Sequence, residues 1–197
     1  MLLKMCRSVL DRSGALNEVS TVGKGNAMAA ITVRGGYSRP RSIDILNGLF
    51  GKKFRGNTYQ HGACQIAPHL VAWFPPVGLS PTEWIKYGNA DQTGFRNILS
   101  PSGDEIRMAN LRPLNPCRRT LITKFSNDIH LVFARFIALK PRSYRFIGGF
   151  VYVRTEANGD RIYRRVLTQI SDKSHWLNPE EVSDILRGTN RNVIEEG

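Results

Sequence analysis

The sequence predicts an α+β fold: a mainly antiparallel, β-barrel-like sheet flanked by a short N-terminal helix and a C-terminal helix. Three observations predict it. Apolar and polar residues alternate in successive runs through the second half of the chain, which is typical of half-buried strands. An Asn158-Gly159 pair separates two of these runs, as in a β-hairpin. Residues that begin and end helices bracket one segment before the strands and one after them.

The two predicted helices have recognisable ends. The first covers residues 42–50, with Ser42 as its N-cap and Gly51 as the residue that ends it. The second begins after Asn178, a favourable N-cap that is followed by proline at the first helical position, and ends at Gly188. Both segments carry apolar residues at helical spacing, so each is expected to pack one face on the sheet.

The strands are predicted from the alternation of apolar and polar residues, and from the prolines and glycines that interrupt this alternation. One strand segment, residues 64–75, is interrupted at Pro68. The later strands are predicted at residues 105–110, 120–125, 129–139, 144–154 and 161–170. Between these groups, residues 75–103 hold four prolines and four glycines and are predicted to be a long loop with one helical turn at 81–87. Loops of that length usually serve as lids or binding loops.

The chain divides into one domain and two tails. Residues 1–40 are rich in glycine and small polar residues and are predicted to be a poorly ordered tail that holds one strand at 30–33. Residues 41–190 are predicted to form a single β-rich nucleic-acid-binding domain, and residues 191–197 a second tail.

Charge points to the class of partner. The 197 residues hold 28 Lys and Arg against 16 Asp and Glu, which gives a net charge of +12. Residues 112–165 carry twelve of the basic residues and three of the acidic ones, so most of the excess lies there. A local excess of this size attracts polyanions, and the preference for arginine suits contacts with phosphate and guanine. We therefore predict a nucleic-acid partner, with DNA favoured over RNA.

Other compositional features exclude several classes. No apolar run of about 18 residues is present, so no membrane partner is predicted. The three cysteines, Cys6, Cys64 and Cys117, form no Cys-x-x-Cys pair; this argues against a zinc ribbon and suits a reducing cytoplasm. No phosphate-binding glycine loop is present, and no cofactor or metal site is predicted.

Residues 143–166 carry the binding prediction. A two-residue turn at Asn158-Gly159 would place Arg154 opposite Tyr163 and Tyr152 opposite Arg165. One strand face would then combine aromatic rings with guanidinium groups, which together can stack on bases and neutralise phosphates. The predicted nucleic-acid-binding residues on this hairpin are Tyr144, Tyr152, Arg154, Arg161, Tyr163 and Arg165.

Five further binding residues lie outside the hairpin. Arg118 and Arg119 belong to the basic region, and Trp84, Phe95 and Arg96 lie in the predicted loop. For Trp84 and Phe95 an ordinary core position is the competing interpretation.

Candidate catalytic residues are few and scattered. Asp104 and Glu105 are adjacent carboxylates that could hold Mg²⁺ if the protein is a nuclease. His61 and His69 could act as acids or bases in a hydrolase that needs no metal. A Ser-Gly-Asp turn for the carboxylates, and surface or core positions for the histidines, are the competing interpretations.

The segment 127–170 also resembles a known group. Its residues Phe133, Arg135, Tyr144, Phe146, Ile147, Gly148, Arg164 and Arg165 match a pattern of strand, loop, Tyr-x-Phe-Ile-Gly and a closing basic strand. This pattern resembles the PUA-like or SRA-like β-barrels of bacterial restriction and defence proteins. The resemblance implies a barrel that grips DNA and reads a flipped or modified base between aromatic walls, for which Trp73, Trp84 and Phe95 are candidates.

These observations favour a DNA-binding protein of restriction or defence type that uses the hairpin face and the long loop. A small restriction-type endonuclease or a DNA glycosylase is the alternative, because either would need the same basic surface. An RNA-binding protein is the third possibility.

Overall fold

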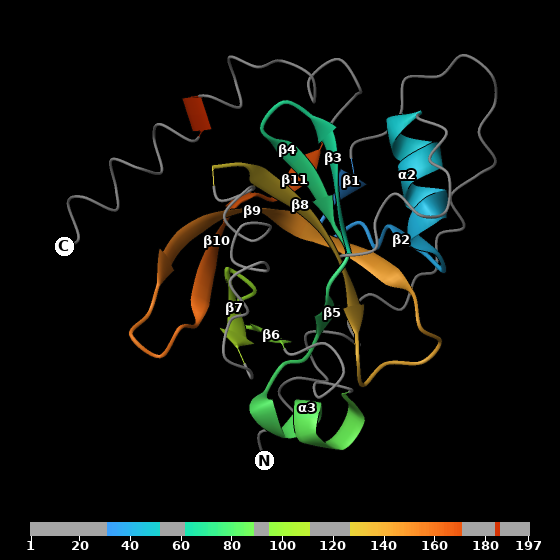
Figure 1. Cartoon of the computed structure of the whole chain (residues 1–197). Coiled ribbons are helices and arrows are strands. Elements are labelled where there is room, and N and C mark those ends of the chain that lie inside the picture. Colours follow the sequence, from blue (N-terminus) through green and yellow to red (C-terminus); the bar gives the residue numbers. More distant parts are fainter. Residues whose placement is uncertain (1–30, 52–61, 89–94, 111–126, 171–183, 186–197) are drawn as a thin grey trace.

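The computed structural model describes residues 31–51, 62–88, 95–110, 127–170 and 184–185. Strands are the main regular element of this part of the chain (Figure 1). The helices with bounds in this part of the chain are α2 (Ser42–Phe50) and α3 (Pro81–Tyr87). The strands are β1 (Ile31–Thr32), β2 (Ser38–Arg39), β3 (Ala63–Ala67), β4 (Leu70–Trp73), β5 (Pro76–Val77), β6 (Phe95–Leu99), β7 (Glu105–Asn110), β8 (Ile129–Phe136), β9 (Tyr144–Thr155), β10 (Arg161–Leu167) and β11 (Gln169–Ile170).

One large twisted sheet dominates the fold. Its strands follow the order β3-β4-β8-β9-β10-β7-β6, while β2 pairs with β9 and β5 pairs with β8. All of these pairings are antiparallel except those of β8 with β4 and β5. A separate pair joins β1 to β11. The predicted α+β class with a mainly antiparallel sheet is therefore confirmed.

The sheet curves back on itself at one seam. Just after β5, the amide of Gly78 donates to the carbonyl of Asn97 at 3.0 Å, and the amide of Leu99 donates to the carbonyl of Gly78 at 3.0 Å. This isolated bridge joins the segment beside β8 to β6. Among the described strands, β3 and β6 end the path without pairing to each other, so the sheet is barrel-like but does not form a closed barrel.

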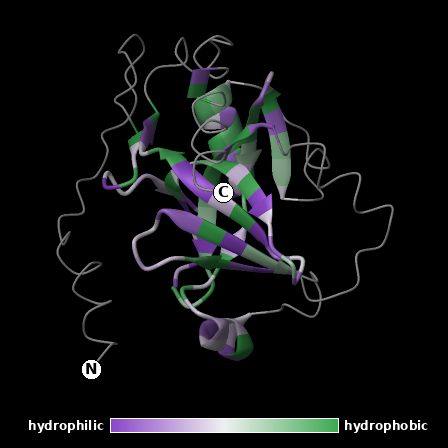
Figure 2. Ribbon diagram, turned by 90° about the vertical axis from the view of Figure 1, so that its left-hand side faces the viewer, coloured by the Kyte–Doolittle hydropathy of each residue, from purple (hydrophilic) through white to green (hydrophobic). Residues whose placement is uncertain are grey.

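Each face of the sheet has its own apolar core. The first core combines residues of β3, β4, β8 and β9 with Ile45, Leu46 and Leu49 of α2. The second lies on the opposite side of β8 and includes Val132 and Phe150. Residues of β8 alternate between the two cores. Figure 2 shows apolar and polar residues interspersed along the strands of the sheet as a whole. Burying both faces explains why β8 is almost entirely apolar.

Helix α2 confirms one predicted end and corrects the other. Gly51 ends it in the left-handed conformation (φ 61°), as expected for a residue without a Cβ. Its N-cap is Arg41, not Ser42, and no side chain caps the helix. The Arg41 guanidinium instead pairs with Asp44 of the first turn at 2.7 Å. The predicted C-terminal helix lies outside the described residues apart from Asp184 and Ile185, which are helical.

The predicted long loop at residues 75–103 is wrong. This segment contains β5, α3 and β6, and residues 89–94 lie outside the described part of the chain. The predicted helical turn coincides with α3, at Pro81–Tyr87. The prolines and glycines belong to tight connections between short elements, which composition alone cannot distinguish from a loop.

Two more predictions concern the ends of the domain. Residues 31–40, which composition places in the tail, contain β1, which falls within the predicted strand at 30–33, and also β2. Residues 1–30 lie outside the described residues. The predicted strand at 120–125 and the tail at 191–197 also lie outside them.

Among the described residues, no helix is long and apolar enough to cross a membrane.

Candidate nucleic-acid interface

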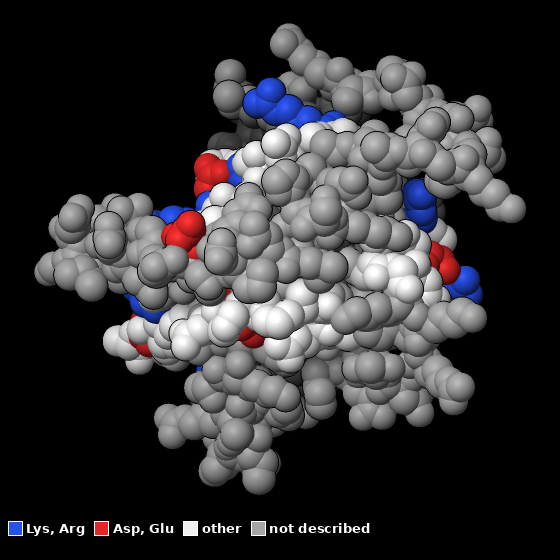
Figure 3. Space-filling view, turned by 90° about the horizontal axis from the view of Figure 1, so that it is seen from above, with Lys and Arg blue, Asp and Glu red and all other residues white. Residues whose placement is uncertain are grey.

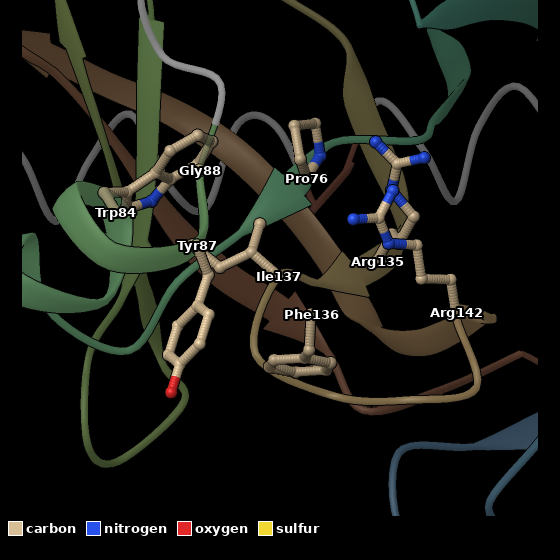
Figure 4. A pocket seen from close by; sticks show the side chains of 8 residues that line it. All are labelled: Pro76, Trp84, Tyr87, Gly88, Arg135, Phe136, Ile137 and Arg142. Carbon is tan, nitrogen blue, oxygen red and sulfur yellow. The ribbon is translucent and has the colours of Figure 1, made fainter.

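A small cavity opens between α3 and the loop that joins β8 to β9. Its volume is about 70 Å³. We call this cavity the hollow (Figure 4). Its lining residues are Pro76, Trp84, Tyr87, Gly88, Arg135, Phe136, Ile137 and Arg142. Aromatic and apolar residues form much of the lining, and two arginines form its charged part. None of these described lining residues is a carboxylate.

Trp84 fixes α3 against the sheet. Its indole Nε1 donates to the carbonyl of Asn97 at 2.8 Å, and the residue is only 2% exposed. A Cβ at Gly78 would lie 2.7 Å from the indole ring, and one at Gly88 would lie 2.2 Å from it. The ring therefore fills space that only glycine leaves open. Trp84 is part of the packed core as well as a wall of the hollow.

The first turn of α3 is held by its own side chains. Ser80 is the N-cap, and its hydroxyl accepts from the Glu83 amide at 3.2 Å. Glu83 in turn accepts from the Leu79 amide at 2.7 Å, with Pro81 at the start of the helix. This capping arrangement lets a seven-residue helix persist and fixes the position of Tyr87.

The outward side of α3 is apolar and aromatic. Ile85 is 75% exposed and Tyr87 is 47% exposed. The ammonium group of Lys86 lies 4.9 Å from the centroid of the Tyr87 ring. A hydrogen bond with Tyr87 raises the pKa of Lys86.

The β8–β9 hairpin supplies the positive charge. Residues 129–155 contain five Lys and Arg residues and no Asp or Glu. These cations are Arg135, Lys140, Arg142, Arg145 and Arg154. Within the described part of the chain, only Arg154 of this set is ion-paired.

Aromatic rings lie beside several cations of this region. The Arg135 guanidinium is 5.9 Å from the centroid of the Tyr144 ring, and that of Arg39 is 4.7 Å from Tyr37. Arg39 on β2 pairs with Tyr144 on β9, which brings it to the same hairpin. This combination of cations and rings is what a nucleic-acid backbone and its bases require.

The predicted turn and register of the β9–β10 hairpin are wrong. The Glu156 amide donates to the Asp160 carbonyl at 2.8 Å, so the loop has three residues, Ala157–Gly159, not two. Gly159 adopts a positive φ of 86°, and Asn158 accepts from the Asp160 amide at 3.0 Å. The loop places Ile162 opposite Arg154, and an irregularity between Ile162 and Tyr163 then places Tyr163 opposite Tyr152.

The predicted aromatic residues of this hairpin differ in exposure. Tyr163 is 4% exposed and packs against Trp73 and His130, with ring centroids 5.1 and 5.4 Å away. Burial raises its pKa, and Arg161 partly opposes that shift. Tyr152 is half-buried, with its ring centroid 6.0 Å from that of Tyr163. Tyr144 packs against the first core.

The predicted arginines of the hairpin have protein partners. Arg165 pairs with Asp104, and its side chain is 18% exposed. It also crosses over Gly148, where a Cβ would lie 2.6 Å from the arginine Cδ. Arg154 pairs with Glu156 at 3.4 Å. Glu156 also pairs with Arg107, and Arg107 lies 3.6 Å from Asp160.

The predicted catalytic residues lie in separate hairpins. Asp104, in the β6–β7 turn, pairs with Arg165, and Glu105 begins β7. His69, in the β3–β4 turn, has a positive φ of 56° and lies 3.2 Å from the Asp128 carboxylate through Nδ1. His61 lies outside the described residues. In the described ranges, no three His, Cys, Asp or Glu side chains are grouped as metal ligands would be.

The remaining predicted binding residues are dispersed. Phe95 and Arg96 lie in β6 and are half-buried, and the Nε of Arg96 is buried with no hydrogen-bond partner in the described part. Arg118 and Arg119 lie outside the described residues. Sequence reasoning did not select Tyr87, Arg135 and Arg142 as one site. The absence of acidic residues from 129–155 was the signal that could have identified two of them.

On the face of the molecule seen from above, basic and acidic residues are mixed, unlike in the acid-free β8–β9 hairpin. In Figure 3, the Lys and Arg atoms form small separate patches, several of them beside Asp or Glu atoms. No broad basic surface is visible among the described residues of that face. The hollow is at the other end of the molecule, beside α3 in Figure 1.

The fold and the lining of the hollow define a class: a mainly antiparallel α+β domain with an arginine-lined hollow. No family model and no curated protein sequence matches the chain. Among solved structures, the chain is similar in fold to "The 5-Hydroxymethylcytosine-Specific Restriction Enzyme AbaSI", with a TM-score of 0.50 and 18% sequence identity. The match covers 87% of this chain and 55% of that one. The chain thus spans about half the length of that enzyme, and the likeness concerns the fold alone.

Proposed function

We propose that this protein is a DNA-binding module of a restriction or defence system and that it reads a modified base. The acid-free β8–β9 hairpin carries the proposal. Its four cations without ion pairs in the described part, Arg135, Lys140, Arg142 and Arg145, lie on a fold similar to that of a restriction enzyme. Cations without carboxylate partners are available to phosphates.

Arginine makes this surface selective for nucleic acid over simple anions. A guanidinium group binds phosphate oxygens through two parallel hydrogen bonds and also stacks on flat rings. Tyr87 lines the hollow together with Arg135 and Arg142, and Tyr144 lies beside Arg135. Tyr37 lies beside Arg39 of the neighbouring β2. The surface can therefore contact both the backbone and the bases of DNA.

Reading of a modified base rests on the neighbour's printed specificity and on the aromatic cluster of the second core. Tyr152 is half-buried beside Tyr163, and Trp73 and His130 lie behind Tyr163. A flipped base would stack on Tyr152, the accessible member of the cluster. Stacking of one base contributes about 1–3 kcal/mol, which can offset the cost of unstacking it from the duplex.

Fluorescence anisotropy with three matched duplexes tests the proposal. The duplexes differ at one position, which is cytosine, 5-methylcytosine or 5-hydroxymethylcytosine. We expect binding to all three that weakens as salt rises, and at least about tenfold tighter binding to one modified form, the equivalent of about 1.4 kcal/mol. Equal affinity for the three duplexes would limit the function to DNA binding, and no binding would contradict the proposal.

The same samples address the alternatives. Incubation with and without Mg²⁺, resolved on a denaturing gel, detects an endonuclease by metal-dependent strand breaks. Breaks that appear only after alkali treatment reveal a glycosylase. A structured RNA that displaces the duplex at equal concentration would favour the RNA-binding possibility.

A further inference from the structure

Two arginines from neighbouring segments of the chain line the hollow. Arg135 comes from the end of β8, and Arg142 from the loop before β9. Figure 4 shows both guanidinium groups on the same side of the hollow. We propose that Arg135 and Arg142 together hold one backbone phosphate of the bound DNA, an inference that rests on the proposed function and assigns a contact within it.

Charge balance argues for an anion between them. Within the described residues, neither guanidinium has an ion pair or a hydrogen bond. The guanidinium of Arg135 makes a cation–π contact with the ring of Tyr144. Two like charges that converge on one cavity repel each other, and a carboxylate is the usual remedy inside a protein. Because the described lining holds no carboxylate, a phosphate of the ligand can supply the compensating charge.

The backbone holds Arg135 in place before any ligand arrives. Its amide donates to the carbonyl of Pro75 at 2.9 Å, and Pro76 is its partner in the β5–β8 pairing. The carbonyl of Pro76 in turn accepts from the side-chain amide of Asn97 at 3.1 Å. The strand thus fixes the backbone of Arg135, so only the freedom of its side chain is lost when it binds a phosphate.

Size and lining favour a phosphodiester over a nucleobase. At about 70 Å³, the hollow is far smaller than the roughly 300–1,000 Å³ of pockets for drug-sized ligands. A phosphate group needs little room, and its two sugars would extend out of the hollow. Tyr87 and Phe136 line the hollow and offer apolar surface to a sugar. This arrangement fits a DNA backbone that passes across the opening.

The salt dependence of binding distinguishes one shared phosphate from two separate ones. In duplex DNA, each phosphate that a protein neutralises adds about 0.9 to the magnitude of the slope of log K against log[salt]. We expect the double variant Arg135→Ala/Arg142→Ala to reduce that magnitude by about 0.9, and neither single variant to exceed this reduction. A reduction of about 1.8 in the double variant would mean two phosphates, and an unchanged slope would remove the hollow from the interface.

A methylphosphonate scan then locates the phosphate. Each backbone position in turn is replaced by the neutral group, and the affinity of the parent is compared with that of the double variant. We expect one position at which neutralisation weakens the parent about tenfold or more, because charge-assisted hydrogen bonds are removed, while the double variant is unaffected. If every position affects the two proteins equally, the shared phosphate is excluded.

Control variants and free anions complete the test. Arg41→Ala removes the same charge from an exposed ion pair with Asp44, and it should keep the parent's response at the located position. A cooperative thermal transition in each variant establishes that it is folded.

If the parent binds no DNA, the proposed function itself fails. If the parent binds DNA and the variants behave as the parent does, only this inference fails. Displacement of DNA by a deoxynucleoside monophosphate at micromolar concentration, but not by inorganic phosphate, would assign the hollow to a free nucleotide and overturn it.

Discussion

Two arginine-rich regions of this protein look alike in the sequence and differ in the structure. Around the hollow, Arg135 and Arg142 have no carboxylate partner among the described residues. At the β9–β10 tip, which we define as Arg107, Arg154, Glu156 and Asp160, each arginine is paired. The comparison teaches that the number of arginines in a segment does not measure its capacity for phosphate. What matters is how many of their charges the fold has already neutralised.

The largest expected effect concerns the wall of the hollow. Trp84→Ala should lower the free energy of unfolding by about 3–5 kcal/mol, because the indole fills the space at Gly78 and Gly88 and satisfies the Asn97 carbonyl. Urea denaturation measures the loss. The neighbouring Ile85→Ala is the control, since a side chain in solvent should change stability by at most about 0.5 kcal/mol. Similar losses in both variants would mean that α3 is not anchored through Trp84.

Alkaline pH probes the buried side of the β9–β10 hairpin. Burial raises the pKa of Tyr163 in the folded protein, whereas the unfolded chain ionises near pH 10. The contribution of this residue to stability is therefore full below pH 10 and is lost as the pH rises towards the folded value. The loss approaches about 1.4 kcal/mol per pH unit. Tyr163→Phe should reduce this decline, and denaturation curves at pH 9 and pH 11 should differ less for the variant than for the parent.

Arg165 is the next test, because the sequence predicts that it binds DNA and the structure pairs it with Asp104. Arg165→Ala should cost about 1 kcal/mol, since the pair is partly exposed and the arginine stem also packs over Gly148. A double-mutant cycle with Asp104→Ala should give a coupling of at least a few tenths of a kcal/mol. If Arg165→Ala flattens the salt dependence of DNA binding as much as Arg142→Ala, pairing does not withdraw an arginine from the interface.

The smallest effect is expected at the β9–β10 tip. Arg154→Ala removes an exposed pair at 3.4 Å and should change stability by only a few tenths of a kcal/mol. In Arg154→Ala, the magnitude of the slope of log K for DNA binding against log[salt] should decrease by less than it does in Arg142→Ala. Anisotropy titrations at several salt concentrations compare the two variants directly. An equal fall would mean that Arg154 contacts phosphate despite its pair with Glu156.

Local patterns predict much of the fold. The alternation at residues 105–110 matches β7 at both ends, and the proline after Ser80 marks the start of α3. The predicted turn at Asn158-Gly159 is wrong by one residue, because a hydrogen bond between the side chains of Asn158 and Asp160 favours a three-residue loop. That step, together with the irregularity between Ile162 and Tyr163, changes which residues of β9 and β10 lie opposite each other.

The site was harder to predict than the fold. Asp104 and Arg165 are 61 positions apart, and their pairing depends on how β10 joins β7. The hollow likewise needs the β5–β8 pairing, which brings Pro76 beside Arg135. Sequence pattern reports which residues share a strand face, but it does not report which distant carboxylate reaches a given cation.

The strands β8 and β9 supply both apolar cores. Leu131 and Phe133 of β8 face the first core, while Val132 between them faces the second. Phe146 and Ile147 of β9 are likewise divided between the two. Because the same two strands form a common wall, neither core can be exposed to water while the other remains packed. The described sheet should therefore unfold in a single cooperative transition, with equal calorimetric and van't Hoff enthalpies.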